Sequence, residues 1–335
     1  MIKIRNWFSL LFVLFFVFAS LLISVNFLVD PYGLNNLFQL EEINKNKTQT
    51  DGQSRRFKFS LMQNKDFDGV FLGSSEMTFL GDTDKAKKLS GYDFFNMAFN
   101  EQEIFETYSY LEKITSTRNN LKIAIISLNL LKFSKDSPEY RQIKPEELFQ
   151  TNNFLMYLSI SSLVDSLKTL YKNFRNYEQI YNDRGTKIVN RAKYYNIPEN
   201  EVISWTRKNV ESSPNYFYEI SKNFQVDQAK LNTLKKIVSL CEKKNIQLKL
   251  LIPPLYQKHL QKLNIDHKNK LASLKLMISE IHPVYDFMVD HELNSDFMNF
   301  IDQVSHPSKK ISLKILNDIF SEDDNLEYGE LLSNQ

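Results

Sequence analysis

The N-terminal hydrophobic segment is continuous rather than periodic. Residues 6–29 contain no charged side chain and are rich in Phe, Leu and Val, and a helix of about 20 apolar residues crosses the hydrocarbon core of a bilayer. Because Lys3 and Arg5 precede the segment, the positive-inside rule predicts a cytoplasmic N-terminus and an exported body at residues 30–335. A cleaved signal peptide is the alternative, but it needs a shorter apolar region. The pattern favours an uncleaved single-pass anchor in a bacterial cytoplasmic membrane, with a periplasmic or extracellular body.

Beyond this segment, short apolar runs alternate with stretches of helical periodicity. The runs predict buried strands at residues 67–74, 92–99, 121–128, 246–252 and 284–289. The periodic stretches predict helices at residues 84–89, 101–116, 226–244, 271–280 and 309–320. Such alternation predicts an α/β fold in which helices cover a central parallel sheet.

The alternation is interrupted at residues 131–225, which we interpret as a mainly helical insertion. Apolar residues at helical spacing predict one amphipathic helix there, from Leu163 to Phe174. Residues 168–177 interleave basic and aromatic side chains, which would suit lipid headgroups or a polysaccharide, although an amphipathic helix with a solvated face is the simpler interpretation.

The rest of the chain divides into four parts. They are a cytoplasmic stub and anchor (1–29), a juxtamembrane segment (30–66), a core (67–130 and 226–322) and an acidic, frayed tail (323–335).

Composition excludes several classes of protein. Only 8 of 335 residues are Gly, and neither G-x-G-x-x-G nor a P-loop motif occurs. The 42 Lys and Arg, less Lys3 and Arg5, leave 40 against 40 Asp and Glu in the body, so nucleic-acid binding is not expected. The single cysteine, Cys241, and the incomplete zinc motif at His291-Glu292, with Ser295 in place of the second His, give no metal site. We therefore expect no cofactor and no metal.

Polar residues follow three of the predicted strands, where sites gather in parallel sheets. They are Gly73-Ser74-Ser75, Asn96 to Asn100, and Ser127-Leu128-Asn129. A serine at such a turn can present its hydroxyl while its N–H helps to stabilise an oxyanion. Alone, each cluster is explained as well by a helix cap or by local backbone hydrogen bonds.

Asp302 and His306 lie just before the last predicted helix. An acid near a histidine can fix its tautomer and leave Nε2 as a general base. An isolated Asp–His pair is more often structural, but together with the serine and the asparagines it completes a set of groups for acyl transfer.

Six short motifs follow one another along the chain. They are Val29-Asp30-Pro31-Tyr32-Gly33, Leu72-Gly73-Ser74-Ser75, Asn96-Met97-Ala98, Ser127-Leu128-Asn129, Ile252-Pro253-Pro254 and His306-Pro307-Ser308. Their order and context resemble the SGNH (GDSL-type) hydrolase superfamily, and more narrowly its membrane-anchored branch related to the alginate-type O-acetylation proteins. The resemblance covers the chain except residues 131–225 and the tail.

This resemblance implies a three-layer α/β/α fold and a role for each candidate residue. Ser75 would be the nucleophile, His306 the base and Asp302 its orienting acid. The oxyanion donors would be the N–H groups of Ser75 and Asn100 and the side-chain amide of Asn129. The substrate would be a glycan or an acyl ester, and the partner a multi-spanning membrane O-acyltransferase.

Three positions depart from the family pattern. Asn100 and Ser127 stand where the family has glycine, and Asp302 precedes His306 by four positions rather than three. Asp296 or Asp286 could replace Asp302, or the site could be a Ser–His dyad. Three functions remain open at this point: acyl transfer to or from glycan hydroxyls, a carbohydrate esterase with the same residues, and a non-catalytic glycan-binding or assembly subunit.

Overall fold

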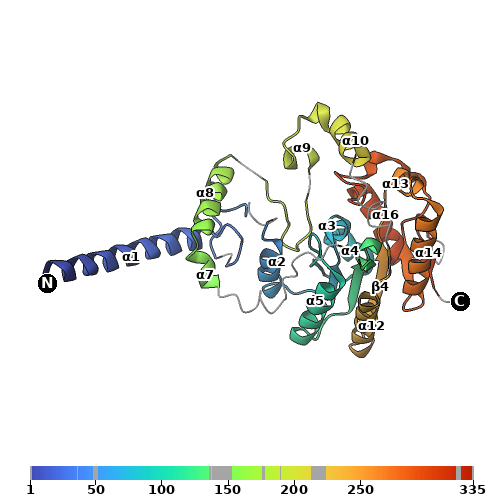
Figure 1. Ribbon diagram of the computed structural model, residues 1–335, viewed down its shortest axis with the longest axis horizontal. Helices are drawn as coiled ribbons and strands as arrows, with labels where there is room; N and C mark the ends of the chain where they lie inside the picture. Colours follow the sequence, from blue (N-terminus) through green and yellow to red (C-terminus); the bar gives the residue numbers. More distant parts are fainter. Residues whose placement is uncertain are drawn as a thin grey trace. The chain divides into compact units, whose positions relative to one another are not determined.

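The chain folds into two compact units, seen in a computed structural model (Figure 1). The structure describes residues 2–35, 37–47, 52–135, 137, 153–175, 178–188, 190–212, 224–321 and 326–333. The N-terminal unit comprises residues 1–64 and 146–182, and the sheet unit comprises residues 65–145 and 183–335. The segment 131–225, which the sequence suggested as one insertion, contributes to both units, and its residues 138–152 and 213–223 lie outside the described residues.

The sheet unit contains a six-stranded sheet in the order β2-β1-β3-β4-β5-β6. Its strands are β1 (Gly69–Leu72), β2 (Phe94–Asn96), β3 (Ile123–Ser127), β4 (Gln247–Ile252), β5 (Val284–Asp286) and β6 (Glu330–Leu332). The first five are parallel to their neighbours and β6 is antiparallel to β5. The predicted α/β fold with a parallel sheet is therefore confirmed, apart from this edge strand.

The prediction of a frayed tail is wrong for residues 330–332, which form β6. The tail is held because the Asp318 carboxylate accepts the N–H groups of Glu327, Tyr328 and Gly329. The Tyr328 ring is buried against Phe287, with ring centroids 5.3 Å apart. Residues 322–325, 334 and 335 of the tail lie outside the described residues.

Helices precede and follow the strands, near their predicted positions. They include α3 (Ser75–Leu80), α4 (Thr83–Ser90), α5 (Ile104–Thr117), α12 (Gln228–Lys243), α14 (Ile265–Ser279) and α16 (Lys309–Phe320). Asp82, Asp227 and Asn264 cap α4, α12 and α14, each accepting a backbone N–H of the first turn. Helices α5 and α12 contact each other (Figure 1). A buried hydrophobic cluster joins Phe71, Ile125 and Leu251 of the sheet to α3, α4 and α16.

The strand order determines where a site can form. Strand β1 lies between β2 and β3, so the chain crosses in one direction from β1 to β2 and in the other from β3 onwards. The loops that leave β1 and β3 therefore diverge and open a crevice at the carboxyl edge, which is the usual binding position in sheets of this order.

In the N-terminal unit, helix α1 (Ile2–Val29) is long and apolar enough to cross a membrane. Its candidate span is Trp7–Val29, and the most apolar part of this span is almost entirely exposed. Helices α7 (Asn153–Tyr157) and α8 (Ile160–Phe174) lie across the C-terminal end of α1 (Figure 1). Helix α8 confirms the amphipathic helix predicted between Leu163 and Phe174, and α2 (Ser54–Gln63) belongs to the same unit.

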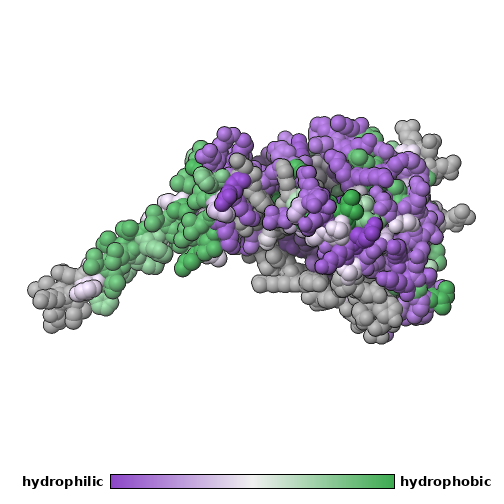
Figure 2. Space-filling view, turned by 90° about the horizontal axis from the view of Figure 1, so that it is seen from above, coloured by the Kyte–Doolittle hydropathy of each residue, from purple (hydrophilic) through white to green (hydrophobic). Residues whose placement is uncertain are grey.

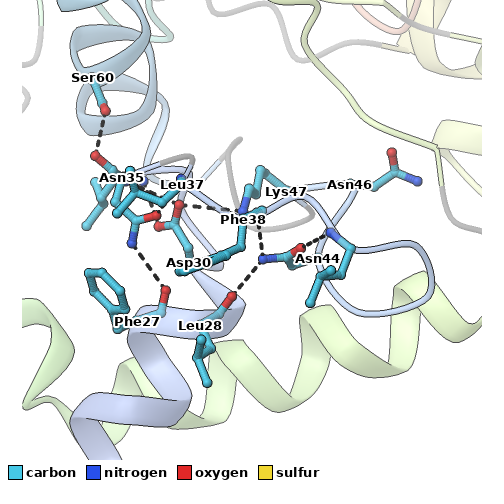
Figure 3. Close-up of polar contacts among 12 residues, drawn as sticks. Phe27, Leu28, Asp30, Asn35, Leu37, Phe38, Asn44, Asn46, Lys47 and Ser60 are labelled. Atoms are coloured by element: carbon cyan, nitrogen blue, oxygen red, sulfur yellow. Dashed lines mark hydrogen bonds and ion pairs between the residues drawn. The ribbon is translucent and has the colours of Figure 1, made fainter.

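A buried polar cluster holds the turn that follows α1 (Figure 3). Asp30 adopts a left-handed φ of 46°, and its carboxylate accepts the N–H groups of Leu34 and Asn35. Lys47 Nζ lies 3.5 Å from Asp30 Oδ2, with both side chains buried. Asn44 donates to the Leu28 carbonyl at 2.7 Å. These contacts fold the segment that ends at Lys47 back onto the end of α1.

Candidate active site

Ser75 is placed by the turn that leaves β1. Ser74 is the N-cap residue of α3 and Ser75 is its first residue, so no carbonyl of that helix accepts the Ser75 N–H. Gly73 adopts a φ of 139°, and a Cβ there would collide with Ser127 Oγ and lie 3.1 Å from the Ser127 carbonyl oxygen. Only glycine therefore allows the end of β1 to pass this close to the end of β3.

The structure brings Ser75, His306 and Asp302 together. His306 Nε2 lies 2.9 Å from Ser75 Oγ, and His306 Nδ1 lies 2.6 Å from Asp302 Oδ1. A carboxylate accepts a hydrogen bond from Nδ1–H, so this contact keeps the proton on Nδ1 and leaves Nε2 as the nitrogen that can accept the serine proton. The His306 ring is buried and packs on Phe79 with ring centroids 4.9 Å apart.

The four-residue spacing between Asp302 and His306 is accommodated by a closed loop. Phe300 and Pro307 form an isolated antiparallel bridge at the base of the loop. The Ile301 N–H donates to the His306 carbonyl at 2.8 Å. This loop turns Asp302 back toward the imidazole, so the extra residue does not separate the two side chains.

The two alternative acids lie elsewhere. Asp296 caps a short 3-10 helix, η3 (Phe297–Asn299), by accepting the Met298 N–H at 2.9 Å. Asp286 is paired with Lys275 at 2.5 Å and accepts the Met288 N–H. Asp302 is the acid in contact with His306 Nδ1.

The environment of Asp302 favours its ionised form. Burial acts to raise the pKa of Asp302, but the hydrogen bond and charge of His306, the hydrogen bond of Tyr195 and the charge of Lys187 outweigh it, so the pKa is lowered. The Tyr195 hydroxyl donates to Asp302 Oδ2. Sequence reasoning missed Tyr195, because it lies in the segment interpreted as an insertion and nothing in its local pattern links it to the loop at residue 302.

Asn129 follows β3 and faces the same cavity as Ser75. Its Oδ1 accepts the Leu131 N–H at 3.1 Å, which caps the 3-10 helix η1 (Leu130–Phe133). Since the oxygen is engaged in this way, the Nδ2 group is the end of the side chain left for a substrate oxygen.

Asn100 is placed differently from Ser75 and Asn129. Its side chain is exposed, and the residue of this loop that lines the cavity is its neighbour, Glu101. Glu101 also adopts the left-handed conformation, with a φ of 56°. The role that the sequence predicts for Asn100, an oxyanion donor through its N–H, stays a prediction.

The cavity beside Ser75 has a volume of about 510 Å³. Its wall includes three of the candidate site residues, Ser75, Asn129 and Asp302, and two charged residues, Glu101 and Lys132. Residues 195–212 add Tyr195, Trp205, Asn209 and Ser212. Every residue that lines it belongs to the sheet unit. Sites for small molecules usually have volumes of about 300–1,000 Å³.

A charge network that is buried at Lys132 and Glu103 joins two loops of this cavity. Lys132 Nζ lies 2.7 Å from Glu101 Oε2 and 2.8 Å from Glu103 Oε1, and Lys230 Nζ lies 3.7 Å from Glu103. Burial acts to lower the pKa of Lys132, but the two carboxylates outweigh it and the pKa is raised. The network ties the turn after β3, which carries Asn129, to the loop after β2.

Glu76 is a second residue that the sequence did not single out. It follows Ser75, is fully buried, and neither carboxyl oxygen has a hydrogen-bond partner among the described residues. Burial raises the pKa of this carboxyl, against the opposing charges of His306 and Lys132. In the sequence, an acid in the first turn of a helix looks like an ordinary response to the helix dipole.

Within the described ranges, no three His, Cys, Asp or Glu side chains are grouped as metal ligands would be. Cys241 is buried in α12, and burial raises the pKa of its thiol to about 12.

No protein-family model and no curated protein sequence matches this chain. The fold and site define a class in general terms: an α/β protein with a mostly parallel sheet and a hydrogen-bonded Ser-His-Asp array in a cavity beside the strand ends.

Proposed function

We propose that this chain is an SGNH-type enzyme that transfers an acyl group, in the first instance acetyl, to or from hydroxyls of a cell-surface or secreted glycan. The observation that carries the proposal is the continuous hydrogen-bonded series from Ser75 Oγ through His306 to Asp302. The strand order β2-β1-β3-β4-β5 and the complete burial of β1, β2 and β3 support a three-layer α/β/α arrangement, because such strands are covered on both faces.

The first half-reaction follows from the positions of the three side chains. His306 Nε2 takes the Ser75 hydroxyl proton while Ser75 Oγ bonds to the acyl carbonyl carbon. The oxyanion that forms accepts hydrogen bonds from the Ser75 N–H, the Asn129 amide and, in the family pattern, the Asn100 N–H; each such donor contributes about 10²–10³ in rate. The bond to the donor oxygen then breaks, and that oxygen takes the proton from His306.

The second half-reaction reverses these steps with a new alcohol. His306 takes the proton of an acceptor hydroxyl, whose oxygen attacks the acyl-Ser75 carbonyl. The bond to Ser75 Oγ then breaks, and Ser75 Oγ takes the proton back from His306. Asp302 stays ionised and holds the imidazole throughout. An acceptor sugar gives a transferase and water gives an esterase, so the same residues serve both reactions.

The cavity wall contains groups that suit a sugar. Tyr195 and Trp205 pack with ring centroids 4.5 Å apart, and Asn209 and Ser212 add an amide and a hydroxyl. Aromatic surfaces with a few polar groups bind amphipathic ligands. Helix α1 would keep the enzyme at the membrane, where a multi-spanning O-acyltransferase partner would deliver the acyl group; the body would lie outside the cytoplasm.

The proposal is tested by labelling the full-length chain, in detergent micelles, with a fluorophosphonate. We expect a covalent label on the wild type and none on Ser75→Ala, since the reagent reacts with activated serines. Absence of label on a folded wild type would reject the enzyme and favour the non-catalytic glycan-binding or assembly subunit.

A second assay separates transferase from esterase. An acetyl-ester donor is supplied with and without oligosaccharides, and acetylated sugar is measured against free acetate. If acceptors never compete with water, the esterase remains.

A further inference from the structure

Helix α8 presents its polar residues to the protein and its apolar residues outward. Its buried side chains are Ser162, Ser166, Thr169 and Asn173. Ser166 Oγ donates to Asn26 Oδ1 of α1 at 2.9 Å. Asn173 both accepts from the Asn46 N–H and donates to the Asn46 carbonyl, each at 2.9 Å. This is the reverse of an amphipathic helix on a soluble domain, where the apolar stripe faces the core.

The outward face of α8 is one continuous apolar stripe. Ile160, Val164, Leu167, Tyr171 and Phe174 follow each other at spacings of three and four, and each is between 46% and 73% exposed. Burying a large apolar side chain gains about 1.5–3 kcal/mol, so five of them in water would be a substantial loss. A contiguous exposed apolar patch marks a surface that meets a partner or a membrane.

The stripe lies next to the end of the candidate span. Asn26 Nδ2 donates to the carbonyls of Tyr157 and Ser159 at 2.8 and 3.1 Å, which fixes the start of α8 on the last turns of α1. The Phe27 and Tyr157 rings pack with centroids 5.4 Å apart. In Figure 2 the hydrophobic surface of α1 continues onto the part of the N-terminal unit beside its C-terminal end.

A second element adds to this surface. Leu37, Phe38, Leu40 and Ile43 are exposed on the segment that Asn44 ties back to the Leu28 carbonyl. The Phe38 ring packs on Phe27 with centroids 6.4 Å apart. Two separate segments therefore present large apolar side chains at the end of α1.

Basic residues accompany the stripe. Lys168, Lys172 and Arg175 lie on or just after α8, and Asp165 is the one acid within the helix. The Arg175 guanidinium lies 5.6 Å from the centre of the Tyr171 ring. Long basic side chains beside an apolar helix face are typical of helices that lie in the membrane interface, where the cations reach lipid phosphates.

We propose that α7, α8 and the segment 37–43 lie in the headgroup–acyl boundary of the membrane that α1 crosses, with the apolar stripe facing the lipid chains. The chain is then held by a span and by an adjacent interfacial surface. This inference does not depend on the activity of Ser75.

The test measures the environment of residue 167. The full-length chain carrying Cys241→Ala receives a single new cysteine by Leu167→Cys, is labelled with a polarity-sensitive fluorophore, and is reconstituted into phosphatidylethanolamine–phosphatidylglycerol vesicles. Leu276→Cys on α14 is the control, because Leu276 is 62% exposed on the sheet unit. We expect a blue-shifted emission at 167, quenched severalfold more strongly by nitroxide lipids than by a water-soluble quencher, and the opposite preference at 276.

Two results would overturn the proposal. Equal, water-like quenching at both positions would show that the stripe faces solvent. A probe at 167 that neither quencher reaches would assign the stripe to contact with a second protein chain. Circular dichroism and thermal unfolding of the same samples show whether each variant is folded, so a folding defect is not taken for either result.

Discussion

The Tyr195 hydroxyl donates a hydrogen bond to Asp302 Oδ2, while the other oxygen of the same carboxylate contacts His306 Nδ1. The segment that carries Tyr195 also contacts residues 297 and 298, which precede the loop that holds Asp302 and His306. Arg191 donates to the Met298 carbonyl at 2.8 Å, and the Arg207 guanidinium lies over the Phe297 ring at 4.9 Å. Tyr195 therefore joins residues outside the predicted core to the proposed triad.

Tyr195→Phe should weaken catalysis through Asp302. A hydrogen bond to a charged group contributes about 1.5–3 kcal/mol, and part of this loss should appear as a fall of on the order of tenfold in the rate constant for fluorophosphonate labelling. Because Tyr195 helps to lower the pKa of Asp302, its removal raises that pKa. Asp302 is then protonated at a higher pH, and the acid limb of the rate profile should move upward.

The matched control for Tyr195→Phe is Tyr108→Phe, which removes a similar hydrogen bond, from Tyr108 to Glu112 at 2.7 Å, on the outer face of α5. Its rate and pH profile should equal those of the wild type. In an Asp302→Asn background, Tyr195→Phe should have little further effect, since both act on one carboxylate. Additive losses would contradict a positioning role.

Asp302→Asn should lower the labelling rate by about 10³–10⁴, because an amide at this position favours the wrong imidazole tautomer. Asp296→Asn is the comparison, since Asp296 caps the preceding 3-10 helix instead of contacting His306. We expect Asp296→Asn to keep its rate within about threefold and to leave stability nearly unchanged, because asparagine caps a helix about as well as aspartate does. Equal rates for the two variants would remove Asp302 from the triad.

The strands were predictable because buried parallel strands are short apolar runs. Ile123-Ala124-Ile125-Ile126 is shorter than a typical helix and rich in β-branched residues, which favours a strand, and the structure has β3 there. The tail was not predictable, because β6 depends on Asp318, which lies on a different element and gathers three backbone N–H groups. Such a contact leaves no local pattern in the sequence.

The site was predictable only where motif order carried information. Ser75 and His306 were identified from their positions at the end of a strand and before the last helix. Tyr195 and Glu76 were not, because their importance comes from burial and from contact with residues distant in the chain. The loop after β2 has its left-handed residue at Glu101, next to Asn100.

Glu76→Gln should change how stability depends on pH. Burial raises the pKa of Glu76, so the unfolded chain loses this proton at a lower pH than the folded chain does. The stability that Glu76 contributes to the wild type is therefore present at acid pH. It is lost as the pH rises above the pKa of this carboxyl in the unfolded chain, about 4.3. Glutamine does not titrate, so Glu76→Gln should gain stability relative to the wild type from pH 4 to pH 8, measured by urea denaturation. Glu242→Gln, at an exposed site on α12, is the control. If the plots of stability against pH were parallel for the wild type, Glu76→Gln and Glu242→Gln, the proposed raised pKa of Glu76 would be contradicted.

Lys132→Met should destabilise the sheet unit because it leaves a buried carboxylate without its nearest cation. The Glu103 side chain is only 2% exposed and lies 2.8 Å from Lys132 Nζ, and breaking a buried pair costs about 3–5 kcal/mol. Lys87→Met is the control, since its pair with Asp93 is exposed and such pairs contribute about 0–1 kcal/mol. The double variant Lys132→Met/Glu103→Gln should recover part of the loss in urea denaturation, because the carboxylate that lost its nearest cation is gone. Lys230, which lies 3.7 Å from Glu103, keeps its hydrogen bond to the Ser134 carbonyl in this variant. If the double variant recovers stability but not the labelling rate, Lys132 also positions the turn that carries Asn129. If the double variant is no more stable than Lys132→Met alone, the loss comes from packing and not from the unpaired buried charge of Glu103.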